Sequence, residues 1–209
     1  MSHLKKVFPK QLLLLLPLVA AMLIIQSCST KKNTFSRRIY HNLTTHYNVF
    51  WNGRESLESG IEDLDKNKKD NYNYILRPNN YGTADEARKI YSKMDRAIEK
   101  GTKGIQKHSM LFKNKEYNKW IDDCYLLIGK AQFYKQDYTS AARTFEYVMR
   151  TYNDRDISYD AQLWLIKTAV EQKHYEEVLS QFEQLETRIN KEKVPFRIKN
   201  RHKPAVILF

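Results

Sequence analysis

Cysteine, glycine and proline are scarce in this sequence of 209 residues. It contains 2 Cys, 6 Gly and 5 Pro, beside 14 Tyr and 9 Phe. Two cysteines give almost no scope for a disulfide framework, so stability must come from packing. Few glycines and prolines argue against a sandwich of many short turns, whereas abundant aromatic residues suit stacked helices. The composition therefore predicts an all-α fold.

The common signatures of catalysis and cofactor binding are also absent from the sequence. It has no glycine-rich phosphate loop, no Gly-x-Ser-x-Gly turn and no Cys-x-x-Cys pair. His41 and His46 are five residues apart and would point away from each other on a helix, and His108 and His174 are isolated in the sequence. The neighbouring acids at 122 and 123 would face different directions. We expect no enzyme activity and no metal site.

The first 27 residues predict a cleavable secretory signal. A basic start with Lys5, Lys6 and Lys10 precedes an apolar run over residues 12–25, and the sequence turns polar directly after Cys28. This run of 14 residues is too short to cross a bilayer as a helix, which takes about 20. The alternative interpretation is a transmembrane anchor, or a plain signal with an incidental cysteine.

The end of this signal resembles the lipobox of bacterial lipoproteins. Its residues are Ile25, Gln26, Ser27 and Cys28, of which Gln26 departs from the usual small or aliphatic residue. The resemblance implies cleavage before Cys28 and a covalent lipid on that residue, and no other cofactor is expected. Several acyl chains suffice for stable anchoring, because each buried methylene contributes about 0.8 kcal/mol. By resemblance to known lipoprotein sorting signals, a serine at position 29, directly after Cys28, favours the periplasmic face of the outer membrane.

The net charge is strongly positive, +12 for the whole sequence and +9 once the three lysines of the signal are removed. Such a balance suits nucleic acid, an anionic membrane or an acidic protein surface. A periplasmic address argues against nucleic acid. It leaves anionic lipid headgroups and an acidic protein partner as the two open interpretations.

Behind the signal, the chain divides by its pattern into four parts. These are a lipidated tether over 28–38, an N-terminal helical region over 39–112, repeats over 113–190, and a linker with the start of a further helix over 191–209. The unpaired apolar end of the last part would either dock on a partner or belong to a longer repeat array. We prefer the second of these readings.

The N-terminal region shows helical spacing with interruptions. Apolar residues recur at three- and four-residue steps over residues 43–64, with one slip in the period. Gly53 and Gly60 weaken the expectation of a continuous helix there. Thr83 and Glu86 predict a capping box for the next helix, which Gly101 and Gly104 should end, with a short helical piece over 105–112. Three tryptophans at helical positions are expected to fill the core: Trp51, Trp120 and Trp164.

Residues 113–190 contain four helical stripes that form two pairs. The first pair has the residue types and spacing of a tetratricopeptide repeat, at Tyr125, Ile128, Gly129, Ala131, Tyr138, Ala141 and Phe145. The second pair is looser, at Trp164, Leu165, Tyr175, Val178 and Phe182. Aligning the alanine at 141 with the valine at 178 gives an offset of 37, so the loop over 153–157 must absorb extra residues. Small residues let two helices approach closely, and stacked pairs bury what one pair cannot.

The lipobox, the repeats and the segment over residues 40–53 together resemble the N-terminal part of the PorW/SprE lipoproteins. These belong to the type IX secretion and gliding-motility machinery of Bacteroidetes, and the segment YHNLTTHYNVFWNG carries the resemblance most specifically. It covers most of residues 23–195, and family members are considerably longer. The resemblance implies an outer-membrane-anchored periplasmic adaptor that contacts periplasmic ring and motor parts and the outer-membrane translocon.

Two other functions fit the same features. One is a lipoprotein scaffold of outer-membrane protein biogenesis, which needs only the anchor and the solenoid. The other is a binder of peptidoglycan or anionic lipid, which would use the basic surface. A solenoid by itself implies binding of other proteins and no catalysis.

Overall fold

The protein is almost entirely helical in a computed structural model that describes residues 32–68, 72–73 and 80–191. The elements in chain order are α2 (Phe35–Thr44), η1 (Thr45–Phe50), α3 (Trp51–Asn67), α4 (Ala84–Lys89), α5 (Tyr91–His108), β1 (Leu111–Phe112), β2 (Lys115–Glu116), α6 (Ile121–Tyr134), α7 (Tyr138–Thr151), α8 (Ile157–Glu171) and α9 (Tyr175–Lys191). The all-α prediction is confirmed. The expected signal peptide and Cys28 lie outside the described residues.

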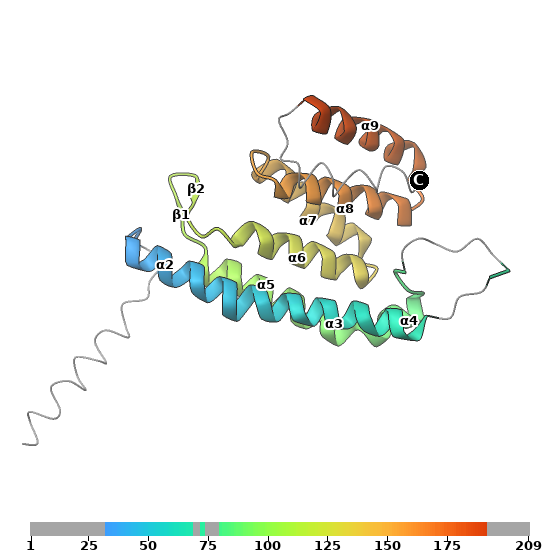
Figure 1. The fold of residues 1–209 in the computed structure, drawn as a ribbon, viewed down its shortest axis with the longest axis horizontal. Helices are drawn as coiled ribbons and strands as arrows, with labels where there is room; N and C mark the ends of the chain where they lie inside the picture. Colours follow the sequence, from blue (N-terminus) through green and yellow to red (C-terminus); the bar gives the residue numbers. More distant parts are fainter. Residues whose placement is uncertain (1–31, 69–71, 74–79, 192–209) are drawn as a thin grey trace, which may run out of the picture.

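Three helical hairpins stack in sequence order (Figure 1). They are α3 with α5, α6 with α7, and α8 with α9; the second helix of each hairpin packs on the first helix of the next. The sequence prediction contained only the last two hairpins. The first was missed because a long connection, which includes α4, separates its two helices. The solenoid therefore begins within the N-terminal region.

The slip in the helical period of the N-terminal region is a π-helical turn. The helices α2, η1 and α3 follow one another without a break, and η1 is the π turn over Thr45–Phe50. A π turn adds a residue to one turn of helix and shifts the register of the side chains. Helix α2 begins at Phe35, within the range expected to be a tether.

Four glycines expected to weaken or end helices instead lie inside them, at close helix contacts. A Cβ built on Gly53 would lie 2.8 Å from Leu127, and one on Gly101 would lie 2.7 Å from Ile128. Gly60 and Gly104 make similar approaches to side chains of α5 and α6. The expected end of the helix at Gly101 and Gly104 is therefore wrong. Close packing onto α6 outweighs the low helix propensity of glycine, which costs about 1 kcal/mol per residue.

The short helical piece expected over residues 105–112 is also absent. Helix α5 continues to His108, and a two-stranded antiparallel hairpin follows, with Leu111 opposite Glu116. The turn needs Lys113 and Asn114 at φ 50° and 61°, the left-handed region. The capping box at Thr83 and Glu86 is present as predicted.

The turns inside the second and third hairpins are equivalent at an offset of 37 residues. Gln136 and Lys173 both have positive φ, and the next residue's N–H donates to the carbonyl five residues back, at Gln132 and at Ala169. Such a left-handed residue ends a helix by satisfying its last carbonyl groups. The offset of 37 residues derived from Ala141 and Val178 is therefore also the spacing of the two turns. The extra residues lie in the connection between α7 and α8.

The largest apolar cluster runs through the first two hairpins into α8. Phe133 and Phe145 are fully buried in it, and Trp164 packs against both rings at centroid distances of 5.3 and 6.1 Å. Trp51, expected as core, is instead 53 % exposed. The π turn rotates the start of α3, so that Val49, not Trp51, faces α5 and lies 3.1 Å from the Cβ position of Gly104.

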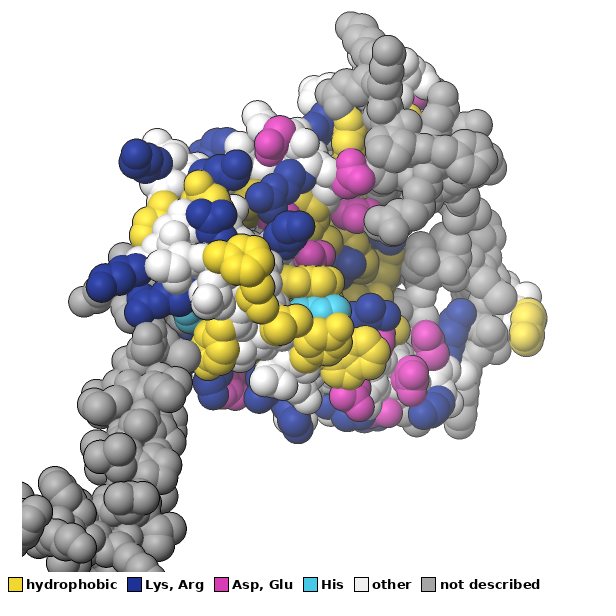
Figure 2. All heavy atoms as spheres, turned by 60° about the vertical axis from the view of Figure 1, so that its left-hand side comes forward, with side chains coloured by type: hydrophobic (Ala, Val, Ile, Leu, Met, Phe, Trp, Pro, Cys, Tyr) yellow, Lys and Arg dark blue, Asp and Glu magenta, His cyan; other side chains and the backbone are white. Residues whose placement is uncertain are grey.

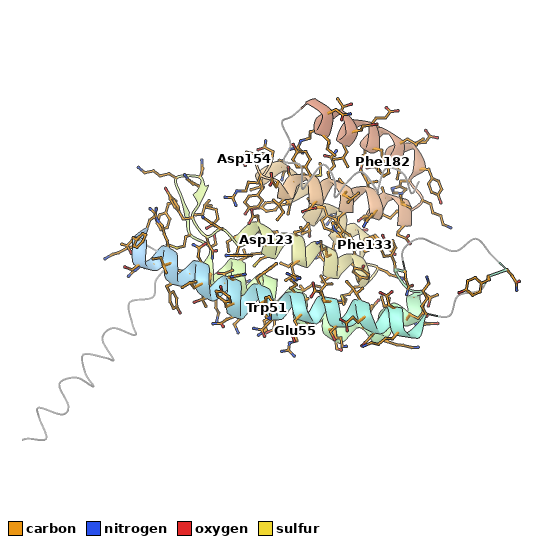
Figure 3. All side chains as sticks on the ribbon, in the orientation of Figure 1. Trp51, Glu55, Asp123, Phe133, Asp154 and Phe182 are labelled. Atoms are coloured by element: carbon orange, nitrogen blue, oxygen red, sulfur yellow. The ribbon has the colours of Figure 1, made fainter. Side chains whose placement is uncertain are left out.

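The outer side of the first hairpin is polar. A hollow between α3 and α5 is lined by Ser56, Ser59 and Lys93, and Ser56 Oγ donates to the carbonyl of Lys93 at 2.8 Å. Glu55 on the same side points away from α6 (Figure 3). A terminal unit of a solenoid needs such a solvated outer face. The α3/α5 hairpin therefore has the character of an N-terminal cap.

Candidate protein-binding surface

The first helices of the three hairpins, α3, α6 and α8, lie next to one another and form one surface, which we call the A-helix face. A hollow between α3 and α6 opens on this face. Its walls carry Phe50 and Leu57 as apolar side chains and Arg54, Asp123 and Lys130 as charged ones. Such a mixed hollow can hold an extended or helical polypeptide by burying apolar area and pairing charges.

Charged residues on the A-helix face repeat with the hairpins. Asp123 and Asp160 are 37 residues apart, and so are Lys130 and Lys167. The two lysines share one aromatic ring, because their Nζ atoms lie 5.3 Å and 4.5 Å from the ring centroid of Trp164. Burial lowers the pKa of Lys167, and the neighbouring Lys130 lowers it further. Helices α6 and α8 thus each present an acid near the helix start and a lysine seven residues later.

Asp123 is the most strongly perturbed carboxyl group among the described residues. Its position on α6 is shown in Figure 3. Burial and, to a smaller extent, the negative charge of Asp122 raise its pKa from 3.8 to about 7, while Lys130 opposes the shift. Near neutral pH both the protonated and the ionised form of the group are therefore populated. It can donate a hydrogen bond to a bound chain as well as accept one, since a protonated carboxyl is both donor and acceptor.

Asp123→Asn is expected to raise the free energy of unfolding at pH 8 by about 1–3 kcal/mol. A pKa shift of one unit corresponds to about 1.4 kcal/mol, and partial solvation of the carboxyl group reduces the energy obtained from this conversion. The raised pKa means that the folded state binds more protons than the unfolded state between pH 3.8 and about 7. Stability therefore falls as the pH rises through that window. Urea titrations should show the advantage of the Asn variant at pH 8 and its disappearance towards pH 4. An equal gain at both values would mean that the charge of Asp123 is not the cause.

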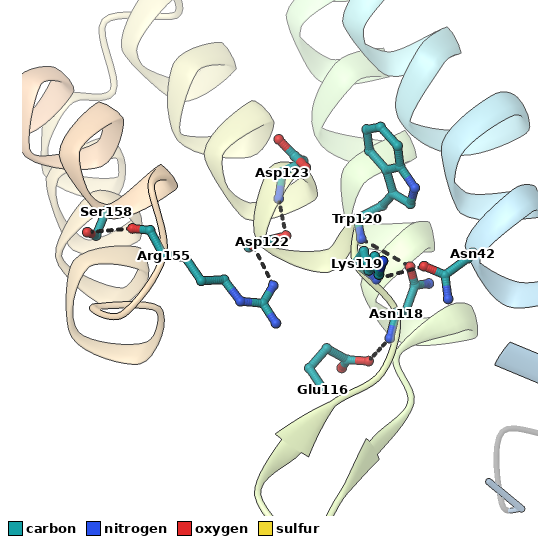
Figure 4. A network of polar contacts seen from close by, with 9 residues as sticks. All are labelled: Asn42, Glu116, Asn118, Lys119, Trp120, Asp122, Asp123, Arg155 and Ser158. Atoms are coloured by element: carbon teal, nitrogen blue, oxygen red, sulfur yellow. Dashed lines mark hydrogen bonds and ion pairs between the residues drawn. The ribbon is translucent and has the colours of Figure 1, made fainter. Parts of the chain in front are cut away.

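A buried polar junction joins the N-terminal helix to the start of α6 (Figure 4). Asn118 is fully buried; its amide donates to Thr45 Oγ1 at 2.7 Å and to the carbonyl of His108 at 3.0 Å. Asn42 accepts from the N–H of Lys119 at 2.9 Å. The polar residues of the segment over 40–53, which carried the family resemblance, thus fix the hairpin connection β1–β2 and the start of α6.

Two histidines meet at the same junction. His41 Nδ1 and His108 Nδ1 lie 2.9 Å apart, so one ring donates and the other accepts. His108, which is isolated in the sequence, therefore has a histidine partner in the structure. Burial lowers the pKa of both rings; Arg37 lowers that of His41 further, and the charge of His41 that of His108. Two imidazoles at hydrogen-bond distance cannot both be protonated without losing that bond.

Acid is expected to destabilise the protein through this histidine pair. The lowered pKa values mean that the unfolded state binds more protons, so stability is complete above the ordinary pKa of 6.5 and falls as the pH drops below it. The slope approaches about 1.4 kcal/mol per pH unit for each proton taken up on unfolding. Urea titrations from pH 8 to 5 should show it in an Asp123→Asn background, because the raised pKa of Asp123 contributes a slope of opposite sign over the same range. His41→Gln with His108→Gln should remove the slope, whereas the exposed His174→Gln should keep it; an unchanged slope in the double variant would contradict the assignment.

The residues predicted for packing of the first repeat lie where its two helices meet. Ala131, Ala141 and Phe145 are fully buried, and a Cβ on Gly129 would lie 2.5 Å from the ring of Phe145. Ile128 is buried against α5, while two tyrosines are half-buried, Tyr125 against Tyr147 and Tyr138 against Phe133.

The second repeat packs less completely than its pattern suggested. Leu165 and Val178 are buried, and Trp164 and Phe182 are partly buried against the two apolar clusters. Tyr175 does not pack, since it is 60 % exposed at the first turn of α9. No following hairpin covers it among residues 32–68, 72–73 and 80–191, so its expected packing role is wrong for this part of the chain.

Trp120 and Asp122 take positions that the sequence did not resolve. The ring of Trp120 stacks on His46 at 3.7 Å between centroids. Asp122 accepts a hydrogen bond from Arg155 at 2.6 Å and so ties α6 to the turn before α8. The repeat of Asp123 and Lys130 at Asp160 and Lys167 was missed, although applying the offset of 37 to the charged residues would have found it.

Neither a membrane-crossing helix nor a metal cluster is found in the described ranges. No helix there has the length and apolar character that a bilayer span requires. In the same ranges, His, Cys, Asp and Glu side chains nowhere gather in groups of three or more that could hold a metal ion.

Comparison with known proteins agrees with the arrangement of the hairpins. The family model described as a tetratricopeptide repeat-like domain matches residues 55–192, which includes most of α3 and all of the following helices. No curated protein matches the chain. Domains of this kind are typically non-enzymatic scaffolds that bind other proteins. With three stacked hairpins and a match over more than half of its length, the chain belongs to the tetratricopeptide repeat-like family.

Proposed function

We propose that this protein is an outer-membrane-anchored periplasmic lipoprotein that acts as a non-enzymatic adaptor in type IX protein secretion and gliding motility. The observation that carries the adaptor role is the A-helix face, where acid and lysine positions recur on α6 and α8 around Trp164. Regularly spaced charges on adjacent helices suit an extended partner chain, because each hairpin can hold one stretch of it.

The cellular setting rests on sequence resemblance. The pattern at Cys28 supports lipid anchoring, and the segment over 40–53 resembles the lipoproteins of the type IX machinery. In this protein that segment forms the buried junction with Asn118. By the same resemblance, the partners are periplasmic ring and motor parts and the outer-membrane translocon.

Charge reversal on the A-helix face tests this proposal. Lys130→Glu with Lys167→Glu should reduce capture of secretion-machine components from envelope membranes at least tenfold, which corresponds to about 1.4 kcal/mol of binding free energy. The matched control is Arg143→Glu with Arg150→Glu, because these residues are exposed on α7 and undergo the same change in charge. The control should capture the same components as the parent.

Two results would contradict the proposal. The first is a parent protein that never recovers secretion-machine components. The second is a depletion phenotype in which many barrel proteins fall together while cargo export continues. That result would favour the scaffold of outer-membrane protein biogenesis.

A further inference from the structure

A row of large apolar side chains lies exposed along the N-terminal helix, on α2, η1 and the start of α3. Their exposed fractions run from 44 % to 76 %, and they are Phe35, Ile39, Tyr40, Leu43, Tyr47 and Trp51. Figure 2 shows apolar side chains gathered on this side of the molecule, with Lys and Arg side chains beside them. We call this row the N-terminal stripe. Contiguous exposed apolar surface of this kind marks an interaction site in a soluble domain.

The π turn keeps the N-terminal stripe on one side of the helix. Five of its residues are spaced by four, from Phe35 to Trp51. In an α-helix of 3.6 residues per turn, each step of four drifts about 40° around the axis. The wider turn over Thr45–Phe50 counters this drift. The same turn places Thr45 and Val49 in the buried contact with α5. The helix therefore has one buried side, which faces α5, and one exposed side, which carries the N-terminal stripe.

The surface around the first part of the N-terminal stripe is positively charged, and acidic side chains begin only past its last residue, with Glu55 and Glu58 on α3. No acidic residue occurs before Glu55, whereas Lys32, Arg37 and Arg38 flank the start of the stripe. The hairpin β1–β2 packs beside it, since the guanidinium of Arg38 lies 4.1 Å from the ring of Tyr117.

This hairpin and its flanks add to the positive charge. Lys113, Lys115 and Lys119 are exposed there. The acid of the hairpin, Glu116, accepts from the backbone N–H of Met110 and of Asn118, so its charge is turned inward.

We infer that the N-terminal stripe is a docking surface for an anionic membrane, in which the helix lies along the headgroup region. Aromatic and aliphatic side chains on one side, with Lys and Arg beside them, are the pattern of a helix that lies in a bilayer interface. Trp and Tyr prefer that depth because their rings are apolar with a polar edge. A second copy of the chain is disfavoured, since the two cationic surfaces would repel each other.

The position of the stripe in the chain agrees with a membrane occupant. Cys28 precedes Phe35 by seven residues, which span at most roughly 25 Å when extended. The inference goes beyond the proposed adaptor role, because it concerns a different face from α6 and α8. It also holds whether the chain is retained by a lipid on Cys28 or by its N-terminal apolar segment.

Tryptophan quenching in vesicles tests the inference. The full chain is reconstituted into vesicles of phosphatidylglycerol or of phosphatidylcholine that contain a lipid with a nitroxide in the upper acyl chain. We expect quenching of tryptophan fluorescence in the phosphatidylglycerol vesicles, and loss of most of that quenching in Trp51→Phe. Leu43→Asp should lose it as well. Leu179→Asp, on a leucine of α9 that is also more than half exposed, should keep it.

Several outcomes would overturn the inference. Equal quenching in the parent and in Trp51→Phe would place Trp51 outside the bilayer. Equal quenching in both lipids would remove the role of anionic headgroups. Protein cross-links through Tyr47, either to a second copy or to another envelope protein, would assign the stripe to a protein partner. None of these measurements depends on the capture of secretion-machine components through Lys130 and Lys167. Failure of the adaptor proposal would therefore appear in the capture experiment and not in these measurements.

Discussion

Phe145→Ala is expected to lower the free energy of unfolding by about 3–5 kcal/mol, the range for removing a fully buried phenylalanine. The ring fills the space left by Gly129, whose Cβ position is only 2.5 Å away, and it packs on Trp164 of the next hairpin. Removing it leaves a cavity between two hairpins. The cost is a large part of the 5–15 kcal/mol that stabilises a typical domain.

Urea unfolding followed by the helical circular dichroism signal measures this effect. The matched control is Phe35→Ala, because Phe35 is 76 % exposed and its loss should change stability by less than about 0.5 kcal/mol. A loss below 1 kcal/mol in Phe145→Ala would mean that the contact between the second and third hairpins contributes little. The solenoid would then not be a single cooperative unit.

Cys28→Ala is expected to abolish lipid attachment and with it retention in the outer membrane. Incorporation of labelled palmitate should fall to background, and the protein should appear unprocessed or soluble in envelope fractionation. The physical reason is that each acyl methylene contributes about 0.8 kcal/mol to membrane partitioning, and the alanine variant has no thiol to carry a chain.

The second cysteine supplies the control for this experiment. Cys124 is fully buried, and burial raises the pKa of its thiol to about 12, so it stays neutral and inaccessible. Cys124→Ala should therefore keep the label and the membrane fraction of the parent. If Cys28→Ala fractionates with the outer membrane like the parent, the anchor assignment is wrong.

Packing of the N-terminal stripe against a bilayer would set the orientation of the solenoid. The stripe and Cys28 lie at the N-terminal end of the chain, and the A-helix face is formed by α3, α6 and α8. An adaptor held in this way would present its binding surface in a fixed direction. The two proposals are thus compatible, although each rests on its own residues and its own experiment.

The amino-acid sequence determined those features that depend on local spacing. Apolar residues at helical steps defined α6 to α9, Thr83 and Glu86 defined a helix start, and the small residues Gly129 and Ala141 defined one repeat. These follow from the sequence because a helix period and a capping box each involve residues only a few positions apart.

The tertiary structure alone decided the features that join distant segments. Gly53 and Gly101 would weaken isolated helices, yet here they allow close contact with Leu127 and Ile128. The hairpin of α3 with α5, the pairing of His41 with His108 and the exposure of Trp51 also depend on which helices meet. The free energy of such contacts comes from packing between distant parts of the chain. It therefore overrides local propensity at positions that the local pattern cannot identify.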